Sequence, residues 1–281
     1  MSKLRLVGAI FGLIYCSAAF TAPTTSVTFD TESAHTNSLE CTKLIATGNP
    51  EYPPYLFKDS SNPKALIGAN AEILKEIGKE LNIEIGIIYS GPWSRAQKEV
   101  REGRIDLIAG AFYTKPRSMY MDYIHPAFLI TKSVVWIDPN RRIKYNKKED
   151  LIGLKGITVI NNSFGQDFDT FAKAQLSITT VPSLKQAFGM IKLGRVDYLL
   201  YEESPARAYA ASLRFEKLVG TVGPEISSEG LYLTLSHQSK CNTPALREKL
   251  TKSLNKLLDQ GYQQKALKTG LTMWRNDPIN N

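Results

Sequence analysis

The chain has 281 residues, of which 43% are hydrophobic and 22% are charged, and its formal net charge is +8. This composition excludes a disordered or fibrous protein, and the length suggests two globular domains of ordinary size or one large one. A basic protein favours anionic partners. Its Lys and Arg residues nevertheless form no run of the kind that marks a nucleic-acid surface, so we expect no nucleic-acid partner.

Residues 1–22 have the pattern of a secretory signal peptide. Lys3 and Arg5 precede a short apolar run, and small residues follow it. Cleavage after Ala19 and cleavage after Ala22 both fit this pattern, although the second leaves a Pro at the start of the mature chain. The pattern therefore predicts an exported, periplasmic protein.

A lipid anchor at Cys16 is disfavoured, because the residue before a lipidated Cys is normally small and here it is Tyr15. Residues 23–42 are rich in Ser, Thr and Asn, which indicates a flexible leader. No later segment is long and apolar enough to be a membrane helix. We expect the mature protein to be soluble and monomeric.

From residue 43 onward, predicted strands alternate with predicted helices. Apolar residues at helical spacing predict a helix over 70–81, and a capping box at Ser94 and Gln97 predicts a second helix that ends at Gly103. Apolar and β-branched runs predict strands at 44–48, 83–89, 105–110 and 129–137.

The second half repeats this arrangement. Ser163 and Ser183, each followed three residues later by Gln, predict two more helix starts, and Thr243-Pro244 predicts the start of a long final helix. Further strands are predicted at 157–160, 196–201 and 231–236.

Strands that alternate with crossover helices indicate an α/β fold with mostly parallel sheets. Two such runs predict two lobes, and the last strand and helix are left over. We expect these to return to the first lobe, which then comprises 43–132 and 229–281, while the second comprises 133–228. Ligands of open α/β sheets bind beyond the carboxyl ends of the strands, so we expect the functional residues there.

Aromatic rings follow the first two strands. Tyr52 and Tyr55 lie on a loop that two prolines make rigid, and Trp93 precedes a predicted helix. Such rings can cover the apolar part of a ligand, although each could instead pack in the core.

Groups suited to anions follow later strands. Arg117 has the planar fork that binds a carboxylate through two hydrogen bonds, and Thr114 offers a further donor. Ser163 marks a predicted helix N-terminus, which also favours anions. The alternatives are a solvated Arg and a Ser that only caps its helix.

Glu202 and Glu203 follow the strand at 196–201 and could pair with a ligand ammonium, or could simply be exposed. Together the strand ends therefore suit a carboxylate or a zwitterion. The chain has no nucleophile elbow, phosphate loop, dinucleotide fingerprint or zinc motif, and its three His residues are scattered. We therefore expect no catalytic residue, metal or cofactor.

Two cysteines, Cys41 and Cys241, remain in the mature chain. In an oxidising compartment such a pair favours a disulfide, with two separate thiols as the alternative.

Several motifs follow one another in a particular order. They are Tyr52-Pro53-Pro54-Tyr55 with Phe57, the run 103–110, Thr114 and Arg117 followed by Asp122-Tyr123, and Gly194-Arg195-Val196-Asp197. In order and spacing they resemble Y-P-P-F-x-F, G-K-x-D-x-I-x-A-G, T-x-E-R…D-F and G-R-V-D. These are motifs of the polar amino-acid-binding class of periplasmic solute-binding proteins, family 3, and the resemblance spans about residues 43–274.

The resemblance implies roles for individual residues. Arg117 would bind the ligand carboxylate with Thr114 and Ser163, the rings of Tyr52, Tyr55 and Trp93 would flank the side chain, and Glu202 would replace the usual Asp that pairs with the α-ammonium. The full set of expected ligand-binding residues is Tyr52, Tyr55, Trp93, Gly110, Phe112, Thr114, Arg117, Asn162, Ser163, Phe164 and Glu202.

The chain also departs from the family pattern. Phe112 and Phe164 replace small hydroxyl residues, and Ala69, Asn70 and Glu72 replace Phe and two Asp of the segment L-x-G-F-D-V-D-L. The replacements at 112, 164 and 202 weaken the amino end of an amino-acid site more than the carboxyl end. The ligand is then larger, aromatic or not an α-amino acid.

The resemblance further implies hinge closure about crossovers near Thr131–Val135 and Ile226–Leu231, and delivery to the membrane subunits of an ABC importer. Two alternatives stay open. One is a sensory or orphan binding protein without a transporter. The other is a dehydratase of prephenate- or arogenate-like acids, with Glu202 as a general acid.

Overall fold

The computed structural model describes residues 41–278, which belong to one unit that spans 39–281. The predicted signal peptide, both cleavage positions, Cys16 and most of the predicted leader lie outside the described residues. Within 41–278, no helix has both the length and the apolar character needed to cross a bilayer.

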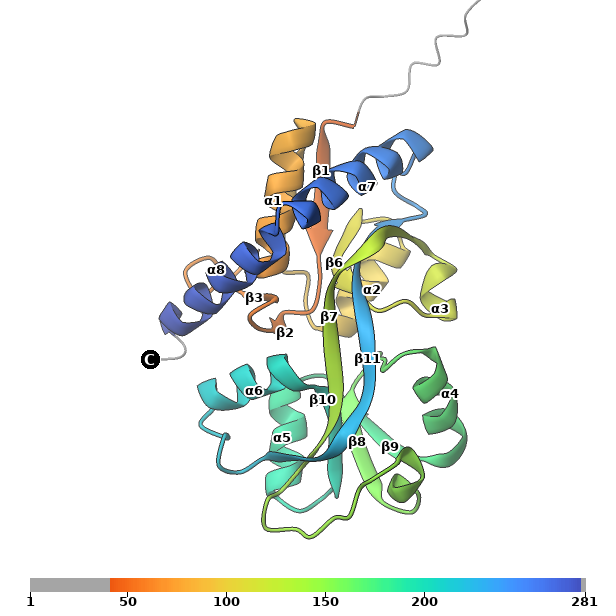
Figure 1. The fold of residues 1–281 in the computed structure, drawn as a ribbon, viewed down its shortest axis with the longest axis vertical. Helices are drawn as coiled ribbons and strands as arrows, with labels where there is room; N and C mark the ends of the chain where they lie inside the picture. Colours follow the sequence, from red (N-terminus) through yellow and green to blue (C-terminus); the bar gives the residue numbers. More distant parts are fainter. Residues whose placement is uncertain (1–40, 279–281) are drawn as a thin grey trace, which may run out of the picture. The chain divides into compact units, whose positions relative to one another are not determined.

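The described residues form an α/β fold with the helices and strands in alternation (Figure 1). The first part of the chain contains β1 (Lys43–Thr47), β2 (Glu51–Tyr52), β3 (Leu56–Lys58), β4 (Leu66–Ile67), α1 (Ala69–Leu81), β5 (Glu84–Ile87), α2 (Trp93–Arg101), β6 (Leu107–Ala111), α3 (Lys115–Ser118) and β7 (Met121–Ile137). The second part contains η1 (Lys148–Leu151), β8 (Lys155–Val159), α4 (Gln166–Gln175), β9 (Ser177–Val181), α5 (Leu184–Lys192), β10 (Tyr198–Glu202), α6 (Glu203–Ser212), β11 (Gly220–Ser236), α7 (Pro244–Asp259) and α8 (Tyr262–Asn276).

The main sheet has the strand order β5-β1-β6-β11-β7-β10-β8-β9. The pairs of β1 with β5 and β6, and of β8 with β9 and β10, are parallel. The long strands β7 and β11 are antiparallel to each other and run through both halves of the fold (Figure 1). The predicted two-lobed α/β fold is confirmed, and β7 and β11 are its two crossovers.

The first lobe is the half of the fold around β1, β5 and β6, and the second lobe is the half around β8, β9 and β10. The middle parts of β7 and β11 connect them, with Glu229 opposite Thr131 and Leu231 opposite Leu129. The register of β11 shifts between Val222 and Ser227 and again between Leu231 and Leu233. Because such irregularities interrupt the ladder, they allow the paired strands to bend.

Two of the four predicted helix caps are correct. The Ser183 hydroxyl accepts a hydrogen bond from the Gln186 N–H at 3.3 Å, and Thr243 caps α7 in the same way. The predicted cap at Ser94 is wrong, because α2 already begins at Trp93 behind Pro92. The predicted cap at Ser163 is also wrong, since its hydroxyl donates to the Asp169 carboxylate and α4 begins later, behind Gly165.

The predicted single C-terminal helix is two helices, α7 and α8. Gly261 separates them, and its φ of 67° lies in the left-handed region that glycine adopts readily. Both helices contact α1 in the first lobe (Figure 1). At Gly270 the approach is so close that an added Cβ would overlap the Pro54 carbonyl oxygen. The sequence patterns also missed β9, α6 and the small sheet β2-β3-β4.

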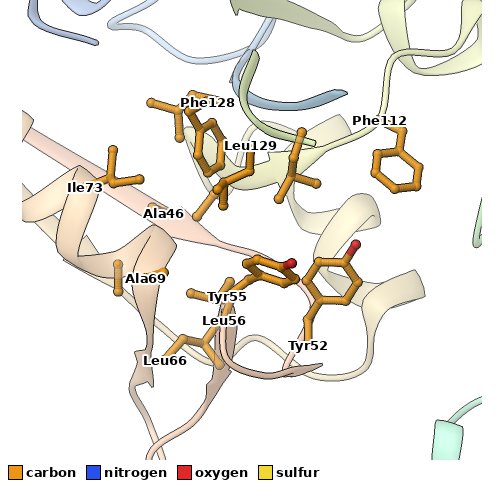
Figure 2. Packing of buried hydrophobic residues seen from close by; sticks show 14 of the residues in the cluster. Ala46, Tyr52, Tyr55, Leu56, Leu66, Ala69, Ile73, Phe112, Phe128 and Leu129 are labelled. Atoms are coloured by element: carbon orange, nitrogen blue, oxygen red, sulfur yellow. The ribbon is translucent and has the colours of Figure 1, made fainter. Parts of the chain in front are cut away.

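The hydrophobic core of the first lobe reaches the loop that follows β1. Figure 2 shows the rings of Tyr52 and Tyr55 next to one another, with Leu56, Leu66 and Ala69 close by. The two ring centres are 5.3 Å apart, and both residues are buried. The loop with its two prolines is therefore held by packing as well as by its covalent structure.

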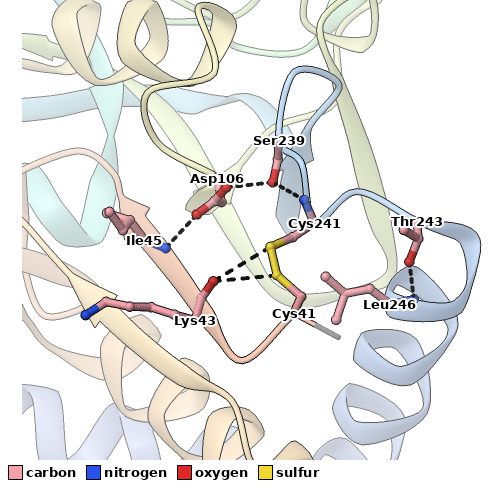
Figure 3. The surroundings of a disulfide bond; sticks show 8 residues. All are labelled: Cys41, Lys43, Ile45, Asp106, Ser239, Cys241, Thr243 and Leu246. Carbon is pink, nitrogen blue, oxygen red and sulfur yellow. Dashed lines mark hydrogen bonds between the residues drawn. A yellow bond between two sulfur atoms is a disulfide. The ribbon is translucent and has the colours of Figure 1, made fainter. Parts of the chain in front are cut away.

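A disulfide joins Cys41 to Cys241, with their Cα atoms 5.5 Å apart (Figure 3). It links the start of β1 to the turn before α7. In the same region the Asp106 carboxylate accepts hydrogen bonds from the Ile45 N–H at 2.8 Å and from the Ser239 hydroxyl at 2.6 Å. The C-terminal segment is therefore fastened to the first lobe by one covalent and several polar contacts.

Candidate functional site

The carboxyl ends of several strands meet at a cavity of about 20 Å³ between the two lobes. β1 and β6 approach it from the first lobe, and β8 and β10 approach it from the second. The residues that line the cavity are Asn49, Tyr52, Leu56, Asn70, Trp93, Ala109, Gly110, Ala111, Phe112, Arg117, Asn162, Glu202 and Leu231. Seven of the eleven predicted ligand-binding residues are among them: Tyr52, Trp93, Gly110, Phe112, Arg117, Asn162 and Glu202.

Arg117 is the buried cation of this cavity, with 6% of the residue exposed. Its Nη1 donates to the Phe112 carbonyl oxygen at 3.1 Å and its Nη2 to the Asn161 carbonyl oxygen at 3.0 Å. The guanidinium also lies 5.3 Å from the centre of the Trp93 ring. Because a guanidinium carries five N–H donors, these two bonds orient the group and leave donors for an anion.

The Asn161 carbonyl oxygen joins the lobes at this point. Besides Arg117, it accepts hydrogen bonds from the Trp93 indole N–H and from the Gln97 amide, both at 3.2 Å. The three donors belong to the first lobe, whereas Asn161 follows β8 of the second. Asn161 has a φ of 61°, a left-handed conformation that Asn tolerates better than most residues, and it turns the chain just after the strand.

Thr114 and Ser163 lie beside the cavity and not on it. Both line an adjoining groove of about 730 Å³, to which Arg117 and Asn162 also contribute. The Thr114 hydroxyl accepts a hydrogen bond from the backbone N–H of Arg117 at 3.3 Å and so caps α3. The Ser163 hydroxyl is bonded to Asp169. In this arrangement both hydroxyls organise the backbone next to Arg117.

The predicted aromatic residues separate into two groups. Tyr52, Trp93 and Phe112 line the cavity, and the ring of Tyr55 packs against that of Tyr52. Phe164 does not line it. The Phe164 N–H donates to Asp169, and its ring packs edge-on against Phe168, 5.8 Å between centres, in the core of the second lobe. Phe164, although among the expected ligand-binding residues, therefore lies in the core of the second lobe and not at the cavity.

Glu202 ends β10 and is the buried acid of the cavity, with 2% of the residue exposed. Burial raises the pKa of Glu202 to about 7, against smaller opposing effects of its own backbone N–H, the Asn162 side chain and Arg117. Its neighbour Glu203 instead forms an ion pair with Arg207 at 2.8 Å on the surface of α6. The two adjacent acids thus have different environments.

Three atoms at the cavity have no hydrogen-bond partner within residues 41–278. They are Asn70 Oδ1, Asn162 Nδ2 and Glu202 Oε2. The Asn162 amide lies close enough to the Glu202 carboxyl to lower its pKa, so these two groups can satisfy each other. Asn70 Oδ1 is then the atom left without a partner, and a buried polar atom in that state costs about 1–3 kcal/mol. The sequence patterns pointed to Asn162 and Glu202 but gave Asn70 no role.

Two further polar residues that the sequence patterns missed connect the lobes at the rim. The Glu51 carboxylate accepts from the Leu184 N–H at 2.7 Å and from the Tyr209 hydroxyl at 3.1 Å. The Asn49 amide donates to the Tyr201 hydroxyl at 2.9 Å. Burial raises the pKa of Glu51, and the two hydrogen bonds oppose that shift. No local pattern marks either residue, because their partners lie far away in the sequence.

The described residues include no group of three or more His, Cys, Asp or Glu side chains placed to hold a metal ion. The chemistry that this site offers is recognition by charge and by hydrogen bonds. A fixed cation and a buried acid line the same, mostly aromatic and aliphatic, space.

The model of the bacterial extracellular solute-binding proteins, family 3, matches residues 44–270. No curated protein matches the sequence.

Several solved structures are similar in fold. One is a variant of ArgBP from T. maritima, with 19% identity over 82% of this chain and 96% of that chain, and a TM-score of 0.68. Another is AbpA of Streptococcus pneumoniae, an amino acid ABC transporter substrate-binding protein bound to L-arginine, with 20% identity, 83% and 96% coverage and a TM-score of 0.68. A histidine kinase sensor domain matches at 18% identity, 82% and 96% coverage and the same TM-score of 0.68.

Proposed function

Because the chain belongs to family 3 of the bacterial extracellular solute-binding proteins, we propose that it captures a small solute that carries a carboxylate in the cavity between its lobes. The observation that carries this proposal is the buried Arg117 guanidinium, which is held by two backbone carbonyl oxygens and lines the cavity. A planar cation fixed in this way suits a carboxylate, which accepts two parallel hydrogen bonds.

The opposite charge of Glu202 supports an amino-acid-like solute. Arg117 and Glu202 both line the cavity, and Tyr52, Trp93 and Phe112 supply rings around it. A zwitterion would place its carboxylate at Arg117 and its ammonium at Glu202, so that each buried charge gains a partner. The rings would contact the remainder of the solute.

Entry of such a solute requires the lobes to separate. A cavity of about 20 Å³ has room for about one water molecule, which is far less than an amino acid needs. We take 43–132 with 229–281 as the first rigid lobe and 133–228 as the second. The bend is then near Thr131–Val135 and Ile226–Leu231, a stretch that the two register irregularities of β11 flank. A solute that contacts both lobes stabilises the closed form.

We further propose that the protein is a periplasmic monomer that delivers its solute to the membrane subunits of an ABC importer. Support comes from the pattern of a signal peptide and from the fold shared with AbpA, an ABC transporter substrate-binding protein. A sensory role is the alternative, and the fold is also that of a histidine kinase sensor domain. Deletion of the gene decides between them: loss of solute uptake supports the importer, and loss of a transcriptional response with intact uptake supports the sensor.

A dehydratase is the enzymatic alternative. It merits a test because the pKa of Glu202 is about 7, and a general acid is most effective when its pKa lies near the working pH. We propose a binding protein and not an enzyme. Incubation of prephenate with the purified protein at high loading should yield no phenylpyruvate. Turnover that disappears in Glu202→Gln would overturn this.

The main test is a ligand screen with protein that has been unfolded and refolded to remove any carried solute. Amino acids, their des-amino carboxylates and their decarboxylated amines are compared by thermal shift, because a ligand that binds only the folded state raises the melting temperature. We expect a shift from at least one carboxylate-bearing class and none from the matching amines. Shifts from amines alone would contradict the proposal.

A further inference from the structure

Asn70 is the residue of the cavity that has no assigned role. It lies in the first turn of α1 and is 1% exposed. Its Nδ2 donates to the Ala109 carbonyl oxygen at 2.6 Å, and its Oδ1 has no hydrogen-bond partner within residues 41–278. A buried side chain that is bonded at one end and unpartnered at the other is oriented toward something that the protein itself does not provide.

The hydrogen bond to Ala109 fixes which end of the amide is unpartnered. A backbone carbonyl oxygen can only accept, so the nitrogen of the Asn70 amide must face Ala109. The amide oxygen is therefore the end left without a partner, and it is an acceptor. Gly110 makes room for this geometry, because its φ is 115° and an added Cβ would lie 2.7 Å from Asn70 Nδ2. The end of β6 is thus shaped to hold this side chain.

Glu202 lines the same cavity with its buried carboxyl. Its Oε2 makes no hydrogen bond within the described residues, but the Asn162 amide, a donor of the same cavity, lies close enough to lower the pKa of Glu202. Asn70 Oδ1 is therefore the acceptor that a solute has to satisfy. An ammonium carries three N–H donors and one positive charge, so it can donate to Asn70 Oδ1 and pair with Glu202, whereas a carboxylate has no donor for either.

We propose that Asn70 is a specificity-determining residue that accepts a hydrogen bond from the ammonium of the solute, jointly with Glu202. The inference rests on the proposed function and narrows its substrate class from carboxylates in general to solutes that also carry an ammonium. It reverses the expectation that the replacements at 112, 164 and 202 leave the amino end weakly bound. Asn70 supplies from α1 an acceptor that the Phe112 side chain does not offer.

The experiment compares matched pairs of probes that differ only in the α-ammonium. They are L-arginine with δ-guanidinovalerate, L-glutamine with glutaramate, and L-phenylalanine with hydrocinnamate. Binding to the refolded full chain is measured by titration calorimetry, and the readout is the ratio of the two dissociation constants within a pair. We expect the amino acid of the pair that binds to be favoured over its des-amino partner by about tenfold or more.

Two variants test Asn70 itself, and a third serves as their control. Asn70→Ala should reduce that ratio by about tenfold, because one acceptor for the ammonium is lost. Asn70→Asp should keep or raise the ratio, because it keeps an acceptor and adds a negative charge, while both affinities fall because the hydrogen bond to the Ala109 carbonyl oxygen is lost. Asn255→Ala is the matched control, since Asn255 also donates through Nδ2 to a backbone carbonyl but lies on the exposed face of α7. Urea unfolding of each variant establishes that it folds.

Each outcome bears on a different statement. Equal binding of both members of a pair by the wild type would overturn the ammonium inference and leave the carboxylate site intact. An unchanged ratio in Asn70→Ala, with both probes weakened alike, would show that Asn70 only supports β6 or holds a buried water, and would overturn the inference as well. If the wild type binds no carboxylate of the ligand screen, these pairs included, the proposed function itself fails, which is seen before any variant is made.

Discussion

The cation and the acceptors of the cavity differ in how they are satisfied. Arg117 is bonded to the carbonyl oxygens of Phe112 and Asn161. Asn70 Oδ1 makes no hydrogen bond within the described residues, and the buried Glu202 carboxyl keeps a raised pKa despite the nearby Asn162 amide. The protein thus orients its cation with its own backbone but leaves an acceptor to be satisfied by the solute. The first arrangement gives a preorganised anchor, and the second gives discrimination, because a wrong solute leaves a buried oxygen unpaired.

Removal of the anchor should have the largest effect. Arg117→Ala should weaken binding of a carboxylate solute from the screen by about 100-fold or more, because two charge-assisted hydrogen bonds are lost. Arg117→Lys should recover only part of this loss, since an ammonium lacks the planar fork. Titration calorimetry measures both.

The control for the anchor is Arg95→Ala, because the Arg95 side chain is 67% exposed. It should bind like the wild type. If Arg117→Ala also bound like the wild type, Arg117 would serve only to join the lobes through Asn161.

Neutralisation of Glu202 should show how much its buried carboxylate destabilises the folded protein. Burial raises the pKa of Glu202 from 4.5 to about 7, so the folded state holds this proton more tightly than the unfolded state does. Below pH 4.5 the carboxyl is protonated in both states and does not change the free energy of unfolding. As the pH rises toward 7, the free energy of unfolding falls, because the unfolded state loses this proton first. Without solute, Glu202→Gln should therefore be more stable than the wild type by up to about 3 kcal/mol at pH 8, and no different at pH 4.

Urea unfolding at pH 4, 6 and 8 measures this difference. Glu203→Gln is the matched control, because that carboxyl lies next in the chain but pairs with Arg207 at the surface of α6. Parallel pH profiles for the wild type and Glu202→Gln would contradict the burial of an acid without a partner.

A smaller effect on solute affinity is expected at the rim of the cavity, where the Glu51 carboxylate has hydrogen-bond partners within the protein. The Tyr209 hydroxyl donates to Glu51 across the lobes, and this contact is available only when they are together. Tyr209→Phe should weaken solute binding roughly 2- to 10-fold, as expected for one hydrogen bond that stabilises the closed form. Tyr113→Phe, at an exposed ring, is the control and should change nothing. Equal affinities for the two variants would mean that this contact does not contribute to closure.

The smallest effect should come from Ser163. The resemblance to the family assigns it to the carboxylate, but its hydroxyl is bonded to Asp169 and it lines the adjoining groove. Ser163→Ala should therefore change solute affinity by no more than about twofold, the range of substitutions without a direct role. A loss of tenfold or more in calorimetry would return Ser163 to the ligand site.

Much of the fold was predictable because it rests on local patterns. The apolar spacing of α1 and the caps at Ser183 and Thr243 are properties of neighbouring residues, and each agrees with the structure. The principle that ligands bind at the carboxyl ends of parallel strands also led to Arg117 and Glu202, which line one cavity although they lie far apart in sequence.

The sequence by itself therefore determined the α/β alternation, the two lobes and the strand ends at which charges and rings accumulate. Only the tertiary structure decided how these groups are used. The Asp169 carboxylate accepts hydrogen bonds from the Ser163 hydroxyl and from the Phe164 N–H. The Ala109 carbonyl oxygen fixes the orientation of the Asn70 amide. The physical reason is that a buried hydrogen bond depends on partners that come from distant segments, and no local spacing encodes which donor meets which acceptor.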